Sequence, residues 1–155
     1  MTTMNLEQLK NIFSAQKSFR WQAAKSSIKQ RKEWLNQLRS EIINTQDELK
    51  SALFQDFGKP AVEVELTEIS PVLFEFEHLL SHMDEWLSDR PVQTPFYLMP
   101  ATSKIVVEAK GQTLILSPWN YPFTLSMAPF IASIAAGNTV IMRPSEKTMH
   151  TSKYI

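Results

Sequence analysis

Asn120 is the residue whose type and setting point most directly to chemistry, because it stands between two aromatic residues and two prolines in S-P-W-N-Y-P-F, residues 117–123. Its neutral amide offers two N–H donors to a bound ligand. Asparagine is also a common turn residue, because its side chain hydrogen-bonds the nearby backbone. The flanking Pro118 and Pro122 would hold the turn rigid in either role. The residues alone therefore leave Asn120 two roles, as a ligand donor or as a turn former.

A second polar turn has the sequence R-P-S-E, residues 143–146. Each of the two turns follows a short apolar stretch typical of a buried strand, and ligands in open α/β sheets bind beyond the carboxyl ends of the strands. The two turns together therefore indicate a ligand site. For Arg143 and Glu146 the alternative is an exposed turn in which the carboxylate interacts with the dipole of the following helix.

Other kinds of site find little support in the sequence. His78 and His82 are four residues apart, so on a helix they would share a face and could bind a metal. No H-E-x-x-H pattern and no third ligand accompany them, so no metal site is expected. The chain has no cysteine, which excludes disulfides, thiolate metal sites and a cysteine nucleophile within these 155 residues. The G-x-G-x-x-G fingerprint of ordinary dinucleotide sites is also absent.

Composition excludes two classes of partner. Lysine and arginine together number 16, as do aspartate and glutamate, so the formal net charge is zero. That balance predicts no nucleic-acid binding and no attraction to an anionic membrane. The apolar stretches are far shorter than the ~20 residues of a membrane helix, and the N-terminus lacks the pattern of a secretory signal. We therefore expect no membrane segment and a cytoplasmic location.

The elements that must position the two turns begin with helices. Thr45 and Glu48 form a capping-box pattern at the start of one helix, and Gly58 would supply its left-handed end. Pro71 either kinks a later helix or begins a new one. The helices expected from apolar periodicity cover residues 5–18, 28–42, 46–57 and 62–88. The apolar stripe of the last one consists of Leu66, Ile69, Leu73, Phe76, Leu80, Met83 and Leu87.

The second half of the chain has a different pattern. It predicts strands at 103–108, 112–116 and 139–142, a nearly all-apolar helix at 123–136, and a final helix that starts at Glu146 with Ser145 as its cap. The last four elements form a βαβα unit, which implies a parallel sheet with a right-handed crossover. Parallel sheets occur with further strands beside them, so we expect an incomplete α/β domain. Without more sheet, residues 123–136 would expose a large apolar surface.

Several stretches, in this order, resemble the aldehyde dehydrogenase superfamily. They are L-F-Q-D-F-G-K-P-A-V-E-V-E-L-T-E-I, E-A-K-G-Q-T-L-I-L-S-P-W-N-Y-P-F and A-P-F-I-A-S-I-A-A-G-N-T-V-I-M-R-P-S-E-K-T. The short N-terminus and L-M-P-A-T-S-K-I-V-V-E are most similar to the class 3 branch, which acts on fatty and coniferyl aldehydes. The resemblance runs from about residue 5 to the last residue. It implies N-terminal helices followed by the first βαβα unit of a Rossmann-like parallel sheet.

The resemblance also implies the chemistry. Members oxidise an aldehyde to a carboxylic acid with NAD or NADP, through a thiohemiacetal. By resemblance, Asn120 is the oxyanion donor, and the main chain of Ser117, Pro118 and Trp119 lines the nicotinamide side. Glu146 would accept hydrogen bonds from the adenosine ribose, and Arg143 stands where the family usually has lysine. An arginine there is compatible with a 2′-phosphate, and so with NADP, or is a tolerated replacement, so the choice of cofactor stays open.

The family's nucleophilic cysteine and its catalytic carboxylate would lie downstream of residue 155. We therefore expect an N-terminal part of such an enzyme, inactive by itself, with residues 1–90 as a helical region, 91–110 as an extended connection with a bridging strand, and 111–155 as the start of the NAD(P)-binding domain. The bridging strand would pair with a second subunit in a homodimer. The alternative is a truncated, non-catalytic product that acts only as an interaction or oligomerisation segment.

Overall fold

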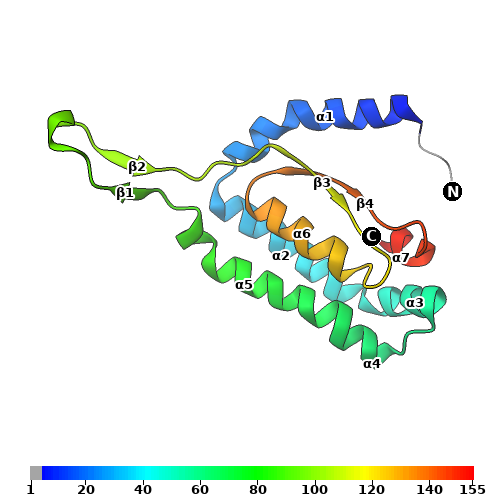
Figure 1. Ribbon diagram of the computed structural model, residues 1–155. Coiled ribbons are helices and arrows are strands. Elements are labelled where there is room, and N and C mark those ends of the chain that lie inside the picture. Colours follow the sequence, from blue (N-terminus) through cyan, green and yellow to red (C-terminus); the bar gives the residue numbers. More distant parts are fainter. Residues whose placement is uncertain (1–4) are drawn as a thin grey trace.

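The computed structural model describes residues 5–155 as a helical body, a pair of parallel strands and a projecting arm (Figure 1). The helices are α1 (Leu6–Lys25), α2 (Ile28–Asn44), α3 (Gln46–Phe57), α4 (Ala61–Val64), α5 (Ser70–Trp86), α6 (Thr124–Ala135) and α7 (Met149–Tyr154). A π-helical turn, η1 (Glu65–Ile69), joins α4 to α5, and a 3-10 turn, η2 (Phe96–Leu98), lies in the arm. The strands are β1 (Arg90–Val92), β2 (Ser103–Ile105), β3 (Gln112–Leu116) and β4 (Thr139–Arg143).

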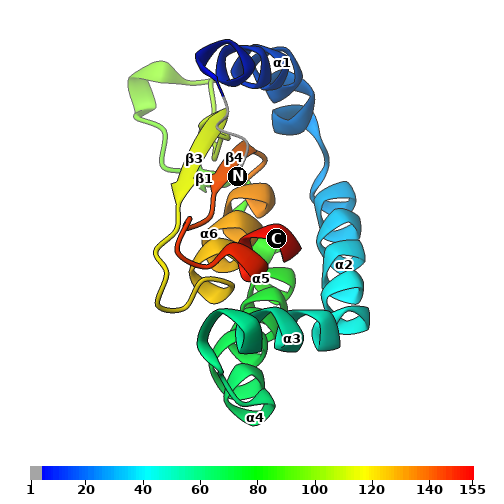
Figure 2. The ribbon, with the colours of Figure 1, turned by 90° about the vertical axis from the view of Figure 1, so that its right-hand side faces the viewer.

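The expected βαβα unit is confirmed. Strand β3 pairs with β4 in parallel, with Gln112 opposite Thr139 and Leu116 opposite Arg143. Helix α6 contacts one face of this pair, and α1 contacts the other face (Figures 1 and 2). Within residues 5–155 this sheet has only these two strands.

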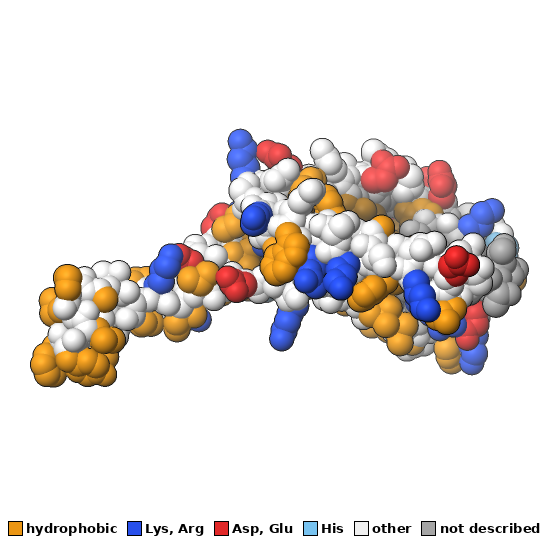
Figure 3. All heavy atoms as spheres, turned by 90° about the horizontal axis from the view of Figure 1, so that it is seen from above, with side chains coloured by type: hydrophobic (Ala, Val, Ile, Leu, Met, Phe, Trp, Pro, Cys, Tyr) orange, Lys and Arg blue, Asp and Glu red, His pale blue; other side chains and the backbone are white. Residues whose placement is uncertain are grey.

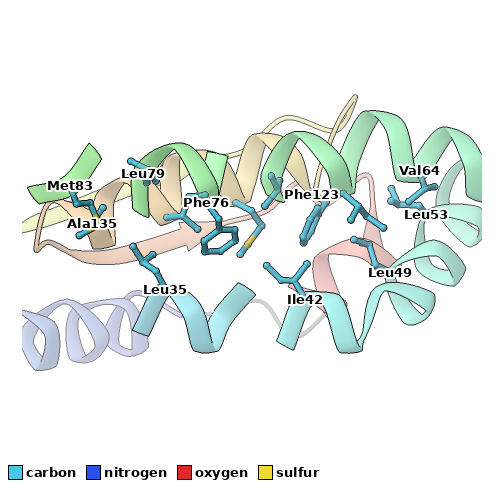
Figure 4. Packing of buried hydrophobic residues seen from close by; sticks show 14 residues of the cluster. Leu35, Ile42, Leu49, Leu53, Val64, Phe76, Leu79, Met83, Phe123 and Ala135 are labelled. Atoms are coloured by element: carbon cyan, nitrogen blue, oxygen red, sulfur yellow. The ribbon is translucent and has the colours of Figure 1, made fainter. Parts of the chain in front are cut away.

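The core lies between α2, α3, α5 and α6 (Figure 4). Phe76 and Phe123 are its largest fully buried side chains, and Ile131 of α6 is also fully buried. Because α2 and α5 cover α6 on the side away from the strands, the expected large apolar surface at 123–136 is wrong. Exposed apolar side chains appear instead on β3, where Leu114 and Leu116 point outward.

Two helix ends differ from the sequence expectation. Helix α1 extends to Lys25, well past residue 18, because no glycine or proline interrupts it before the pair of serines at 26 and 27. Thr45 does not cap α3 with its side chain. Its backbone lacks the extended conformation of an N-cap residue, and its hydroxyl donates to the Glu41 carbonyl oxygen (2.8 Å). The left-handed end at Gly58, with φ of 67°, is confirmed.

The π-helical turn before α5 corrects the expected apolar stripe. Five residues, Glu65–Ile69, form this turn, which shifts the helical phase, so Leu66 is exposed and Glu68 is fully buried. Pro71 lies in the first turn of α5 and lacks the N–H that would reach the Thr67 carbonyl oxygen. The Thr124 hydroxyl of α6 donates to that oxygen instead (3.1 Å). The buried side chains of this stretch are Val64, Glu68, Ile69, Val72, Phe76, Leu79 and Met83.

The arm is a hairpin of β1 and β2, which pair in an antiparallel manner. The sequence predicted a strand at 103–108 after an extended connection. Only 103–105 is a strand, and it pairs within the chain with residues 90–92. The arm projects from the body (Figure 1), and apolar side chains gather at its end (Figure 3). The exposed residues there are Phe96, Tyr97, Leu98 and Met99.

Candidate functional site

The two polar turns of the sequence begin side by side. The Ser117 backbone N–H, just after β3, donates to the Arg143 carbonyl oxygen at the end of β4 (3.1 Å). Both turns therefore leave the carboxyl edge of the parallel pair, which is where ligands bind in open α/β sheets. They also meet further on, because the Lys147 ammonium lies 5.7 Å from the centroid of the Trp119 ring.

Asn120 stands on the exposed part of the first turn. Its neighbours Pro118, Trp119 and Tyr121 are exposed as well, whereas Pro122 is buried and leads into α6. Among the described residues, the Asn120 side chain has no hydrogen-bond partner, so its amide does not bind the backbone of its own turn. The hydrogen-bonding capacity of the amide is therefore open to a ligand.

Ser117 differs from the exposed residues that follow it. Its hydroxyl oxygen is buried and has no hydrogen-bond partner within residues 5–155. A buried polar atom without a partner costs free energy, which is recovered when a bound group supplies the missing hydrogen bond.

The turn that carries Asn120 is held by a buried ion pair that sequence reasoning missed. The Lys59 ammonium contacts Glu68 Oε1 at 2.8 Å, and the backbone N–H of Thr124 donates to Glu68 Oε2 at 3.0 Å. A carboxylate is favourable there, because Thr124 begins α6 and the N-terminal end of a helix carries partial positive charge. Lysine and glutamate are ordinary surface residues by type, and only the π-helical turn brings Glu68 inside. The sequence offered one indication of a special role, which is that Lys59 and Glu68 both lie in a stretch quoted above for its family resemblance.

The second turn holds an exposed ion pair. The Arg143 guanidinium Nη2 donates to Glu146 Oε2 at 3.0 Å. The pKa of the Glu146 carboxyl lies below its ordinary value, first because its own backbone N–H donates to it and second because Arg143 is positively charged. Both charged groups stand at the carboxyl edge, next to the first turn.

The expected helix after this turn begins later than residue 146. Ser145 does not cap a helix at Glu146; its hydroxyl accepts the Lys147 N–H (3.2 Å) within the turn. Helix α7 begins at Met149. The Asp56 carboxylate of α3 accepts hydrogen bonds from the backbone N–H groups of His150 (3.0 Å) and Thr151 (2.8 Å) at the start of this helix. Glu146 therefore lies in the exposed turn before α7 and not in the first turn of a helix.

The two histidines of α5 do not form a metal site within the described residues. The His78 and His82 rings lie 4.5 Å apart, and the His82 ring stacks on Trp86 with a centroid distance of 5.1 Å. No group of three or more histidine, aspartate or glutamate side chains in residues 5–155 is arranged to hold a metal ion. No helix in that range is long and apolar enough to cross a bilayer.

Comparisons with known proteins agree on one family. Residues 3–155 match the family model described as Aldehyde dehydrogenase family. The chain is 38% identical over 152 residues to 4,4'-diaponeurosporen-aldehyde dehydrogenase of Staphylococcus aureus, covering 98% of this chain and 33% of that protein. It is 34% identical to aldehyde dehydrogenase family 3 member F1 of Arabidopsis thaliana, covering 83% of this chain and 27% of that protein.

Solved structures share the fold. The substrate-bound state of Staphylococcus aureus AldH superposes with a TM-score of 0.87 at 37% identity, over 97% of this chain and 32% of that one. Succinic semialdehyde dehydrogenase from Streptococcus pyogenes, in complex with NADP+, superposes with a TM-score of 0.86 over 99% of this chain and 33% of that one. At 17% identity the second match shows the fold alone. The chain spans about a third of the length of the relatives it matches.

Proposed function

Because the chain belongs to the aldehyde dehydrogenase family, we propose that it is the N-terminal part of an NAD(P)-dependent enzyme that oxidises an aldehyde to a carboxylic acid through a thiohemiacetal. The observation that carries this proposal is the exposed amide of Asn120, which has no hydrogen-bond partner within residues 5–155, at the carboxyl edge of β3 and β4. Attack by a thiolate on an aldehyde places negative charge on the former carbonyl oxygen. A fixed amide N–H stabilises that charge in the transition state more than it stabilises the substrate.

The residues at the carboxyl edge fit a nicotinamide dinucleotide. The buried Ser117 hydroxyl lacks a partner within residues 5–155, and the next two residues, Pro118 and Trp119, are exposed. Glu146 is ionised at neutral pH and is an acceptor for ribose hydroxyls. When bound, the cofactor would accept a hydride from the substrate carbon. The Streptococcus pyogenes enzyme, which was solved with NADP+, shows that this fold can hold a cofactor of this class.

The arm gives the proposal a second part. Residues 91–110 would connect the helical region, residues 1–90, to the NAD(P)-binding region, residues 111–155, and would carry the strand that bridges to a second subunit. Its exposed apolar end favours burial against another surface, and we propose that this surface belongs to a second subunit of a homodimer. The same observation supports the alternative function, a non-catalytic segment that acts only through this interaction.

The direct test of the proposal is a chimera. In this chimera, residues 1–155 replace the matching third of Staphylococcus aureus 4,4'-diaponeurosporen-aldehyde dehydrogenase, which supplies the rest of the chain. If the proposal is correct, the chimera oxidises a simple aliphatic aldehyde and reduces nicotinamide cofactor, measured by its absorbance. A chimera that is folded and dimeric but inactive would favour the interaction segment.

The 155-residue chain alone is expected to show no aldehyde oxidation, because it contains no cysteine to act as nucleophile. The measurement is cofactor reduction by the purified chain at high enzyme concentration, with the chimera as the positive control. Turnover of the isolated chain that survives a thiol-blocking reagent would contradict the assigned chemistry.

Glu146→Gln is expected to raise the NADP-to-NAD ratio of kcat/KM in the chimera by roughly tenfold, about 1.4 kcal/mol. The substitution removes a negative charge that would repel a 2′-phosphate, and it releases the Arg143 guanidinium from its ion pair. Arg143→Gln is the matched control and is expected to lower the same ratio. A ratio that both variants leave unchanged would place the adenosine ribose away from this turn.

A further inference from the structure

The buried pair Lys59 and Glu68 is placed where it can control the turn that carries Asn120. The exposed fractions of the two side chains are 8% and 0%. One carboxylate oxygen of Glu68 contacts the Lys59 ammonium, and the other accepts the first backbone N–H of α6, that of Thr124. Both oxygens of this carboxylate are therefore used, and one of them acts on the element that ends the turn.

A buried ion pair is poor evidence for a stabilising role. Removing two charges from water costs free energy that their attraction often does not recover, and apolar residues of similar volume can replace such a pair without loss of stability. Apolar residues cannot orient a neighbouring group in the same way, because hydrophobic packing is non-directional whereas a hydrogen bond depends on the positions of its donor and acceptor. We therefore expect the Lys59–Glu68 pair to orient the neighbouring backbone and not to stabilise the fold.

Four contacts fix the downstream end of the turn. The Lys59 ammonium lies 4.7 Å from the centroid of the Tyr121 ring, directly after Asn120. The Thr124 backbone N–H donates to Glu68 Oε2, and the Thr124 hydroxyl donates to the carbonyl oxygens of Thr67 (3.1 Å) and Glu68 (3.0 Å). The turn is thus attached to the segment from Lys59 to Glu68 at Tyr121, the residue after Asn120, and again at Thr124.

The upstream end of the turn is fixed by the sheet, through the Ser117 N–H and the Arg143 carbonyl oxygen. Between these two ends, Asn120 has no side-chain hydrogen bond to any described residue. Its amide is therefore positioned only through its neighbours, and the neighbours on one side are held by Lys59 and Glu68.

We propose that Lys59 and Glu68 are positioning residues for Asn120: they hold the turn so that the amide points to the site of the developing oxyanion. This inference rests on the proposed function. A displacement of about 1 Å at a reacting group can lower the rate about a hundredfold, so a pair that does not touch substrate can still affect kcat. Asn120 donates the hydrogen bond, and the pair determines where that donor stands.

The first test uses the chimera. Glu68→Gln keeps the shape of the side chain but removes the charge that binds Lys59, and kcat is expected to fall about tenfold or more while KM for the cofactor stays unchanged. The control is Glu65→Gln, because the Glu65 carboxylate forms an ion pair with Lys50 of α3 at 2.9 Å and neither a hydrogen bond nor an ion pair with residues 117–123. This control is expected to leave kcat within about twofold.

A double-mutant cycle separates positioning from a structural effect. In a chimera that already carries Asn120→Ala, the donor is gone, so Glu68→Gln is expected to have little further effect on kcat. Equal losses with and without Asn120 would overturn the positioning role. An inactive parent chimera would count against the proposed function instead, so the two failures are distinguishable.

The second test uses the 155-residue chain and needs no activity. Hydrogen exchange of the Thr124 backbone N–H is expected to become at least about tenfold faster in Glu68→Gln and unchanged in Glu65→Gln. If Glu68→Gln does not fold, the double variant Lys59→Met, Glu68→Met restores an apolar interior and serves in both tests. Unchanged exchange at Thr124 in the folded variant, or an unchanged kcat in an active chimera, overturns the proposal.

Discussion

Asn120→Ala is expected to lower kcat of the chimera by about 10²–10³, which corresponds to about 2.7–4 kcal/mol of lost transition-state stabilisation. The amide is exposed and forms no side-chain hydrogen bond among the described residues. Its removal therefore breaks no hydrogen bond among the described residues, and the only hydrogen bond lost is the one to a bound substrate. The loss should appear in kcat more than in KM, because charge develops on the oxygen only in the transition state.

Stability provides the control for this variant. An exposed substitution that breaks no contact changes the free energy of unfolding by less than about 0.5 kcal/mol, so the urea midpoint of Asn120→Ala should match that of the parent. If Asn120 were a turn former, the variant would lose stability and kcat together. A variant with parental kcat would contradict the oxyanion role outright.

Gly137→Ala is expected to destabilise the fold by about 3–5 kcal/mol, the largest effect on stability that we predict. At a φ of 83°, any residue with a Cβ atom pays about 1–2 kcal/mol. The added Cβ would also stand 2.5 Å from the central carbon of the Arg31 guanidinium, which is closer than van der Waals contact allows. That guanidinium cannot move freely, because it donates to the Ala135 and Ala24 carbonyl oxygens and to the Ser26 hydroxyl. Breaking a hydrogen bond to a charged group costs roughly 1.5–3 kcal/mol.

Gly58→Ala is the matched control, because Gly58 has a similar φ of 67° but no heavy atom within 4 Å of the position of the added Cβ. It should cost only the conformational part, about 1–2 kcal/mol. The two variants are compared by urea unfolding of the 155-residue chain. Equal losses would show that contact with Arg31 has no energetic weight.

The elements of the fold could be predicted wherever one local pattern dominates. The end of α3 at Gly58 follows from a conformation that glycine adopts readily. The strands predicted at 112–116 and 139–142 follow from short apolar runs bounded by turn residues, and their parallel pairing follows from the helix between them.

The errors arose where a distant partner decides the structure. Ser145 seemed to cap a helix, but Asp56, in another part of the chain, supplies the acceptors and moves the start of α7 to Met149. The hairpin at 90–105 was missed because a short strand becomes recognisable only through its pairing partner. No local pattern reports such partners, since they depend on tertiary contacts.

In the candidate site, too, some residues could be predicted from local sequence and others depend on tertiary contacts. Asn120, Arg143 and Glu146 stand out in the sequence because they are polar and follow apolar strands. Lys59 and Glu68 do not stand out, because their burial depends on the π-helical turn. Sequence could thus indicate which residues would face a ligand, but not which residues hold them in place.

The π-helical turn at Glu65–Ile69 also matters for the comparison of relatives. The additional residue in this turn determines whether leucine or glutamate faces the interior, so a relative that is one residue shorter here would present a different side chain to α6 even if every remaining letter were the same. Segment length is therefore part of the information that this region encodes. An alignment that places a gap elsewhere in the helix would pair residues that occupy opposite faces.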